Sequence, residues 1–77
     1  MTVEQLRKIH QARPFHPFEI HLADGRSLLV SHPECLAITP PGRTIGVGLD
    51  DGTIEIVDLL LVTSLKPRTN GRARPRK

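Results

Sequence analysis

The residues best suited to chemistry lie in one short segment, His32-Pro-Glu-Cys35, where an imidazole and a thiol are three positions apart. Both are common zinc ligands, but a structural zinc site needs four ligands at recognisable spacing. The further candidate ligands are His10, His16 and His21, but the sequence has one close pair and no second one at that spacing. We therefore expect no metal site, and we expect Cys35 to act as a small apolar residue near a turn.

Three serines, Ser27, Ser31 and Ser64, are the other candidate nucleophiles, but none stands in the sharp strand-to-helix elbow that activates a serine. A domain this small also has little room for a pocket of roughly 300 Å³. The sequence therefore predicts no catalytic residue, no cofactor and no enzyme activity. Four aspartates have the positions of turn and cap residues: Asp24, Asp50, Asp51 and Asp58.

Gly46-Val-Gly48 matches half of a dinucleotide-binding fingerprint, but it lies inside a predicted strand that is followed by a turn and not by a helix. Two glycines two positions apart leave one face of a strand without side chains. Another backbone or a large side chain can then approach closely. Gly46 and Gly48 are therefore the predicted interaction face.

Charge divides the chain into two parts. Residues 1–65 contain five Lys and Arg and eight Asp and Glu, whereas residues 66–77 contain six basic residues and no acidic one. We expect one folded domain over 1–65 and a disordered tail over 66–77, which has no aliphatic residue larger than Ala73. The tail is a candidate polyanion-binding segment, giving salt-sensitive affinity without base stacking. Its cations are Lys66, Arg68, Arg72, Arg74, Arg76 and Lys77.

Composition also sets the expected compartment. A single cysteine forms no internal disulfide, and no apolar leader or membrane-spanning run is present; the longest aliphatic run is Leu59–Val62. We expect a cytoplasmic protein that does not insert into membranes. With two Phe and no Trp or Tyr, the core is thin and aliphatic, which favours self-association.

The segment from Arg13 to Gly25 connects a predicted helix to a predicted hairpin. Thr2 and Gln5 fit a capping box, which places a helix at about residues 3–12. Pro14 and Pro17 end the helix, and Asp24-Gly25 predicts a type I′ hairpin turn.

Alternating hydrophobic residues predict strands at about residues 18–23, 26–31 continuing after a bend at 35–38, 44–49, 53–57 and 61–65. Asp50-Asp51-Gly52 is the second hairpin turn. We expect a short 3₁₀ turn at Leu59 and Leu60, followed by a last strand that is buried on both faces. The predicted inward residues are Phe18, Ile20, Leu22, Leu28, Val30, Ile45, Val47, Leu49, Ile54 and Ile56.

These elements predict an α+β domain that is mostly β: an N-terminal helix followed by a small, bent, antiparallel barrel of four or five strands, SH3-like or Sm-like. The alternative is an open sheet with the helix packed on one face.

Four runs together resemble a family of small uncharacterised bacterial proteins: Arg-Pro-Phe-x-Pro-Phe-x-Ile-x-Leu-x-Asp-Gly-Arg at 13–26, His-Pro-Glu at 32–34, Gly-Arg-Thr at 42–44 and Ile-Val-Asp-Leu-Leu-Leu-Val-Thr-Ser-Leu at 56–65. That resemblance implies an independent domain and brings no activity. The order of elements is also similar to the Sm-like fold of host-factor RNA chaperones, which implies a ring that holds RNA. Those proteins carry an aromatic-Lys-His triplet where this chain has Val57-Asp58-Leu59, so their RNA-binding side chains are not expected here.

Two functions are consistent with the sequence. The first is a non-catalytic module that self-associates or docks on a protein partner through an exposed strand edge or through Gly46 and Gly48. The second is an Sm-like accessory protein whose basic tail supplies non-specific affinity for nucleic acid. The sequence contains no feature of a small-molecule site.

Overall fold

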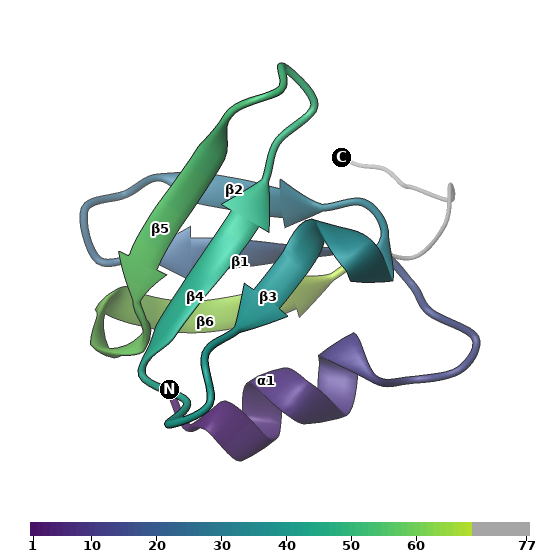
Figure 1. Ribbon diagram of the computed structural model, residues 1–77, viewed down its shortest axis with the longest axis horizontal. Coiled ribbons are helices and arrows are strands. Elements are labelled where there is room, and N and C mark those ends of the chain that lie inside the picture. The colour runs from purple at the N-terminus through teal and green to yellow at the C-terminus, as the bar shows by residue number, and fades with distance from the viewer. Residues whose placement is uncertain (69–77) are drawn as a thin grey trace, which may run out of the picture.

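The computed structural model describes residues 1–68, which form one α-helix and six strands (Figure 1). The helix is α1 (Val3–His10). The strands are β1 (Phe18–Leu22), β2 (Ser27–Val30), β3 (Leu36–Ile38), β4 (Thr44–Gly48), β5 (Ile54–Asp58) and β6 (Val62–Pro67), and two 3₁₀ turns are η1 (Pro33–Cys35) and η2 (Leu59–Leu61).

Helix α1 begins with the predicted capping box. The Gln5 N–H donates to Thr2 Oγ1 (3.3 Å), and the Thr2 N–H donates to Gln5 Oε1 (3.2 Å). The helix ends at His10, two residues before the predicted end, where His10 Nε2 donates to the Pro33 carbonyl (2.7 Å). Leu6 is the helix residue that is fully buried, so α1 is held by one apolar contact face and one bond to η1.

The six strands form two antiparallel sheets of three strands, in the orders β2-β1-β6 and β3-β4-β5. The strands of one sheet cross those of the other (Figure 1). The mostly-β α+β class is confirmed, but the predicted closed barrel is wrong, because no ladder joins the two sheets within residues 1–68. The predicted bent strand of 26–31 and 35–38 is also two separate strands. Pro33 begins η1 between them, and β2 and β3 then belong to different sheets.

Both predicted hairpins are present, but the turn at Asp24-Gly25 is not a two-residue type I′ turn. The Leu22 N–H donates to the Arg26 carbonyl (2.9 Å) and the Gly25 N–H to the Leu22 carbonyl (3.0 Å), so three residues form the loop. Gly25 takes the last loop position with φ +94°, a left-handed conformation that glycine adopts without strain. The loop Asp50-Asp51-Gly52 repeats this pattern, with Leu49 and Thr53 as its flanking pair.

The predicted orientation of strand β5 is wrong. We expected Ile54 and Ile56 to face inward, but both are exposed, and Val57 is buried instead. The three-residue loop pairs Val57 with Ile45 and Ile56 with Gly46, and residues directly opposite each other share a face of the sheet. Ile45 is fully buried, so its partner Val57 must also face the core.

Strand β6 also differs from expectation. The 3₁₀ turn is confirmed as η2, but β6 lies at the edge of its sheet, and Thr63 and Ser64 are exposed, so it is not buried on both faces. The strand runs two residues beyond the predicted end at Leu65, to Pro67.

The core lies between the two sheets and under α1. Phe18, Ile20 and Val30 from one sheet and Ile45 and Val47 from the other are fully buried. Phe18 is the largest of these side chains, and its ring meets the half-buried ring of Phe15 edge-to-face at a centroid distance of 6.0 Å. The two rings therefore fill the space where the connection from α1 enters β1.

We expect Phe18→Ala to lower the free energy of unfolding by on the order of 3 kcal/mol, because removing a fully buried ring leaves a cavity that the neighbours only partly fill. Urea titration followed by circular dichroism measures this change. Phe15→Ala is the control and should cost less, since that ring is only half-buried. A Phe18→Ala variant of near-normal stability would contradict the placement of this ring in the core.

Candidate interaction surface

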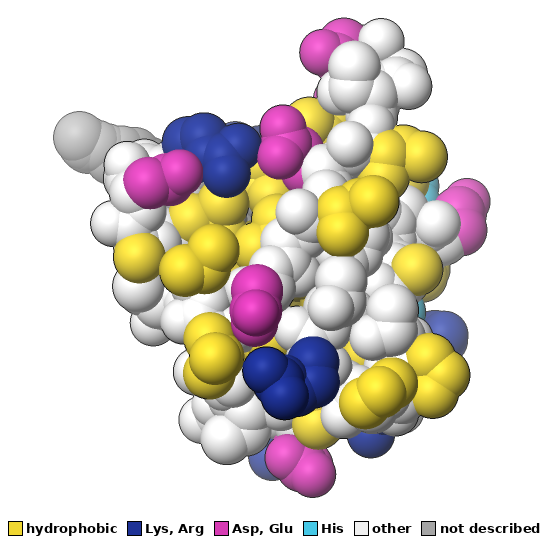
Figure 2. Space-filling model, turned by 60° about the vertical axis from the view of Figure 1, so that its left-hand side comes forward, with side chains coloured by type: hydrophobic (Ala, Val, Ile, Leu, Met, Phe, Trp, Pro, Cys, Tyr) yellow, Lys and Arg dark blue, Asp and Glu magenta, His cyan; other side chains and the backbone are white. Residues whose placement is uncertain are grey.

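Four large hydrophobic side chains are strongly exposed within residues 1–68, and all four come from the segment 54–61. Ile54 is 71% exposed, Ile56 76%, Leu60 74% and Leu61 52%. We call these four residues the β5 surface. Figure 2 turns the side of the molecule that carries β5 forward and shows hydrophobic groups there, separated by acidic and basic side chains.

The backbone of β5 is unpaired on one side. Strand β5 lies at the edge of its sheet. Backbone bonds to the β4 side are made just before and just after this strand: the Leu49 N–H donates to the Thr53 carbonyl, and the Leu59 N–H donates to the Arg43 carbonyl. Hydrogen-bonded pairs alternate along an antiparallel ladder. The N–H and C=O groups of Ile54, Ile56 and Asp58 therefore point away from β4, toward the free edge.

The other three strand edges carry features that discourage pairing with another chain. Strand β6 has Lys66, Pro67 and a register shift opposite His21/Leu22. Strand β3 has three residues and β2 has four. Short strands, lysine, proline and bulges all protect sheet edges. Strand β5 has five residues, two exposed isoleucines and neither lysine nor proline, so it is the least protected edge of the two sheets.

Gly46 and Gly48, the predicted interaction face, lie on the outer face of β4 next to the isoleucines. Gly46 pairs with Ile56 and Gly48 with Ile54. A Cβ built on Gly46 would lie 4.0 Å from Ile54 Cγ2, which is ordinary contact, so the two isoleucines stand beside a strip with no side chains. Because no side chain on β4 covers them, both isoleucines are accessible along the length of their side chains.

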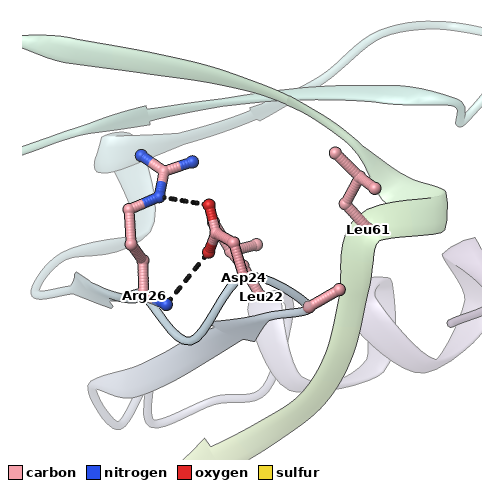
Figure 3. A pocket seen from close by; sticks show the side chains of 5 residues that line it. Leu22, Asp24, Arg26 and Leu61 are labelled. Carbon is pink, nitrogen blue, oxygen red and sulfur yellow. Dashed lines mark hydrogen bonds and ion pairs between the residues drawn. The ribbon is translucent and has the colours of Figure 1, made fainter.

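A groove of about 280 Å³ lies below β5, lined by Leu22, Ala23, Asp24, Arg26 and Leu61. Figure 3 shows Leu61 of η2 on one side of the groove and Arg26 of the β1–β2 loop on the other. Arg26 Nη1 donates to Glu55 Oε1 (3.1 Å), so one wall of the groove contacts the inner face of β5. Its apolar lining has room for a hydrophobic side chain.

The polar groups of this groove are already paired. Asp24 accepts from the Arg26 backbone N–H (Oδ1, 3.0 Å) and from Arg26 Nε (Oδ2, 2.8 Å). The hydrogen bond from the Arg26 backbone N–H is the main cause that lowers the pKa of Asp24, and the bond from the Arg26 side chain lowers it further. In return, the hydrogen bonds to Asp24 and Glu55 raise the pKa of Arg26. Exposed ion pairs add little stability. Their effect here is to hold the β1–β2 loop against β5.

The candidate metal-ligating residues of the described chain are not brought together, whereas two of the candidate serines lie beside His21. Cys35 ends η1 as a free, half-buried thiol, and its N–H donates to the His32 carbonyl (3.0 Å). Within residues 1–68 there is no group of three His, Cys, Asp or Glu side chains that could hold a metal ion. Ser27 and Ser64 lie on opposite neighbours of β1, each across from His21. His21 itself bonds Glu19 (Nε2 to Oε1, 3.2 Å).

Three of the four aspartates have the predicted turn and cap contacts. Asp24 Oδ1 and Asp51 Oδ1 each accept the N–H two residues further on, at 3.0 Å. Asp58 caps η2 by accepting the Leu60 N–H (2.9 Å). These bonds explain why the carboxylates stand next to the two hairpin loops and the 3₁₀ turn.

Most of the candidate polyanion-binding tail lies outside the described residues. Its members there are Arg72, Arg74, Arg76 and Lys77. Lys66 and Arg68, assigned by sequence to the tail, lie against the fold instead. Lys66 pairs with Glu19 across the β1–β6 ladder, and Arg68 Nη2 lies 3.2 Å from Glu19 Oε2. Both cations are exposed.

The sequence predictions missed the β5 surface itself. A signal was available, since a loop of Asp50-Asp51-Gly52 pairs Leu49 with Thr53 and so places odd-numbered residues of β5 opposite the inward residues of β4. A prediction based on this three-residue loop would have placed Ile54 and Ile56 on the outer face of β5. The exposure of Leu60 and Leu61 has no such signal, because a 3₁₀ turn does not follow the alternation of a strand.

No family model, curated protein or solved structure matches the chain. Among residues 1–68, no helix has the length and apolar character required to cross a membrane.

Asp24 and Asp51 should make the stability of the fold depend on pH. Hydrogen bonds to Arg26 and Thr53, respectively, lower the pKa of each carboxyl below its ordinary 3.8. The unfolded chain then binds more protons near that pH, so this stabilisation is present above pH 3.8 and is lost as the pH falls through the lowered values.

We expect Asp24→Asn with Asp51→Asn to lose less stability than the unaltered chain between about pH 6 and about pH 3 in urea titrations. Asp50→Asn is the matched control from the same loop. An equal acid-induced loss in the double variant and the unaltered chain would show that these hydrogen bonds do not control the pH dependence.

Proposed function

We propose that this protein is a non-catalytic protein-interaction module that binds through the β5 surface. The observation that carries this proposal is that all four strongly exposed large hydrophobic residues of the described chain come from one eight-residue segment, 54–61. Single exposed hydrophobic residues are normal on a soluble protein, but here all four belong to one strand and the 3₁₀ turn that follows it, which concentrates them at one edge of a sheet.

Two further features of β5 support binding to protein. Its free backbone groups can pair with another strand, and its edge lacks the protection present on β2, β3 and β6. The isoleucines next to Gly46 and Gly48 then offer apolar contact on the outer face of the same strand. Backbone pairing and side-chain contact at one place are what a strand-binding protein needs.

The contacts of the polar residues in the described chain support the proposal that the module is non-catalytic. The carboxylates of Asp24, Asp51 and Asp58 hold turns, and Arg26 holds a loop against β5. Each of these groups has a structural partner, and none faces a nucleophile in the groove below β5. The groove offers an apolar lining and a satisfied ion pair.

A photo-crosslinking residue, p-benzoylphenylalanine, in place of Ile56 tests this proposal in the cells that produce the protein. We expect covalent adducts to another protein chain from position 56, because Ile56 is the most exposed side chain of the β5 surface. The same replacement at Lys8, an exposed residue of α1, is the control and should give none. Absence of protein adducts from position 56, or equal yields from both positions, would refute the proposal.

A second candidate function, an accessory protein that binds nucleic acid, is favoured by the six basic residues and absence of acidic residues in 66–77. Such a segment releases counterions from a phosphate backbone, which gives sequence-independent affinity. The hydrophobic β5 surface has no role in that function, so the two candidates use different residues.

Titration of labelled RNA and DNA against the full chain at two salt concentrations separates the two candidates. We expect at most weak binding, which salt abolishes and which is lost when Arg72, Arg74, Arg76 and Lys77 are replaced by Gln. The control Ile56→Thr should bind nucleic acid like the unaltered chain. Tight, salt-resistant binding that survives loss of the four tail charges would favour the nucleic-acid function over the proposed one.

A further inference from the structure

We propose that the partner of the β5 surface is an extended peptide segment that adds to the free edge of β5 as a fourth strand of the sheet β3-β4-β5. The segment has hydrophobic residues at alternate positions and Lys or Arg at its flanks. This inference rests on the proposed function and specifies the chemistry of the partner.

The first argument is the backbone of β5. The N–H and C=O groups of Ile54, Ile56 and Asp58 point away from β4, and within residues 1–68 no backbone bond pairs those of Ile54 or Ile56 with another strand. An added strand supplies the missing partners without disturbing the existing ladder. Main-chain hydrogen bonds of this kind give strand-addition complexes their affinity.

The second argument is that both faces of the added strand find apolar contacts. Side chains opposite Ile54 and Ile56 lie on the outer face, next to those isoleucines. Side chains opposite Glu55 and Val57 lie on the inner face, on the side of the groove, where Leu22, Ala23 and Leu61 offer apolar contact beside the paired Asp24 and Arg26 (Figure 3). A peptide with hydrophobic residues at alternate positions places them on the outer face beside the isoleucines, and the groove has room for the residues between them.

The third argument is charge. Between Arg43 and Lys66 the chain has four acidic residues, Asp50, Asp51, Glu55 and Asp58, and no basic one. Asp50 and Asp51 stand at the start of β5 and Asp58 at its end. Arg26 pairs with Glu55 alone among these four. The loop end of the free edge is therefore negative. At the other end Asp58 stands next to the exposed Arg43, whose carbonyl accepts the Leu59 N–H, so a cation is favoured most strongly at the flank of the segment that meets the loop.

The same charges disfavour a second copy of this chain as the occupant. An antiparallel pair of β5 strands around a two-fold axis would bring the Asp58 of each copy toward the acidic β4–β5 loop of the other. Like charges in this arrangement are destabilising. The chain's own basic tail is also a poor occupant, since residues 69–77 contain no aliphatic residue larger than Ala73.

A phage-displayed library of random short peptides, selected on the purified full chain, tests the inference. We expect enrichment of peptides with hydrophobic residues at alternate positions and Lys or Arg at the flanks. Dissociation constants of the enriched peptides are then measured by fluorescence anisotropy against the unaltered chain and two variants, Ile56→Pro and Ile56→Lys.

Ile56→Pro removes an N–H that points to the free edge and not to β4, so the β4–β5 ladder keeps its bonds. Ile56→Lys keeps the N–H and repels a basic peptide, and it preserves the test if the proline variant does not fold. We expect Ile56→Pro to weaken binding about tenfold, the change that loss of one hydrogen bond produces. We expect Ile56→Lys to weaken it by a similar factor, because the added charge repels the basic flanks and the apolar contact of Ile56 is lost. Ser27→Pro on the edge of β2 is the matched control and should bind normally.

Enriched peptides of the expected pattern that lose affinity in both Ile56 variants and keep it in Ser27→Pro would support the inference. Peptides without alternation or basic flanks, binding that the Ile56 variants do not change, or no enrichment at all would overturn it. A stable dimer in sedimentation equilibrium that Ile56→Lys dissociates would also overturn it, because a second copy would then occupy the edge. The crosslinking result at position 56 separates these failures: adducts to a protein with no peptide selected refute only the strand-addition model.

Discussion

The pairing of Ile45 with Val57 across the β4–β5 hairpin is the constraint on which the surface of this protein depends. Ile45 is fully buried, so Val57 must face the core, and the alternation of a strand then sends Ile54 and Ile56 outward. A loop one residue shorter would turn Ile54 and Ile56 toward the core and Val57 toward solvent. The three-residue loop that ends in Gly52 thus determines which hydrophobic residues build the core and which remain exposed.

The same loop chemistry at Ala23-Asp24-Gly25 places a polar contact between the two sheets, which no ladder joins within residues 1–68. Asp24 fixes the Arg26 backbone and guanidinium, and that guanidinium reaches Glu55 on the other sheet (3.1 Å). The pair is exposed and contributes little to stability. It instead links the β1–β2 loop to β5, and Asp24 and Arg26 of this loop region line the groove together with Leu61.

Local signals in the sequence predicted the capping box at Thr2 and Gln5, the buried Phe18, both hairpins and the 3₁₀ turn at Leu59. Each of these depends on residues close together in the chain. The predictions failed where distant pairing decides: sheet membership of β2 and β3, closure of the barrel, and burial of β6. The candidate site was missed for a related reason, because Ile54, Ile56 and Val57 are all apolar and hydrophobicity alone does not choose the inward face of β5.

An exposed hydrophobic edge is a hazard unless something opposes pairing between copies. Strand β6 is protected by Lys66 and Pro67, and β2 and β3 are short, but β5 has none of these features. Its protection is electrostatic, since Asp50, Asp51 and Asp58 place like charges at both ends of an edge that two copies would have to share. Charge of one sign repels an identical strand and attracts a basic one. The charges that oppose pairing of β5 with itself are therefore the same ones that favour the proposed basic segment.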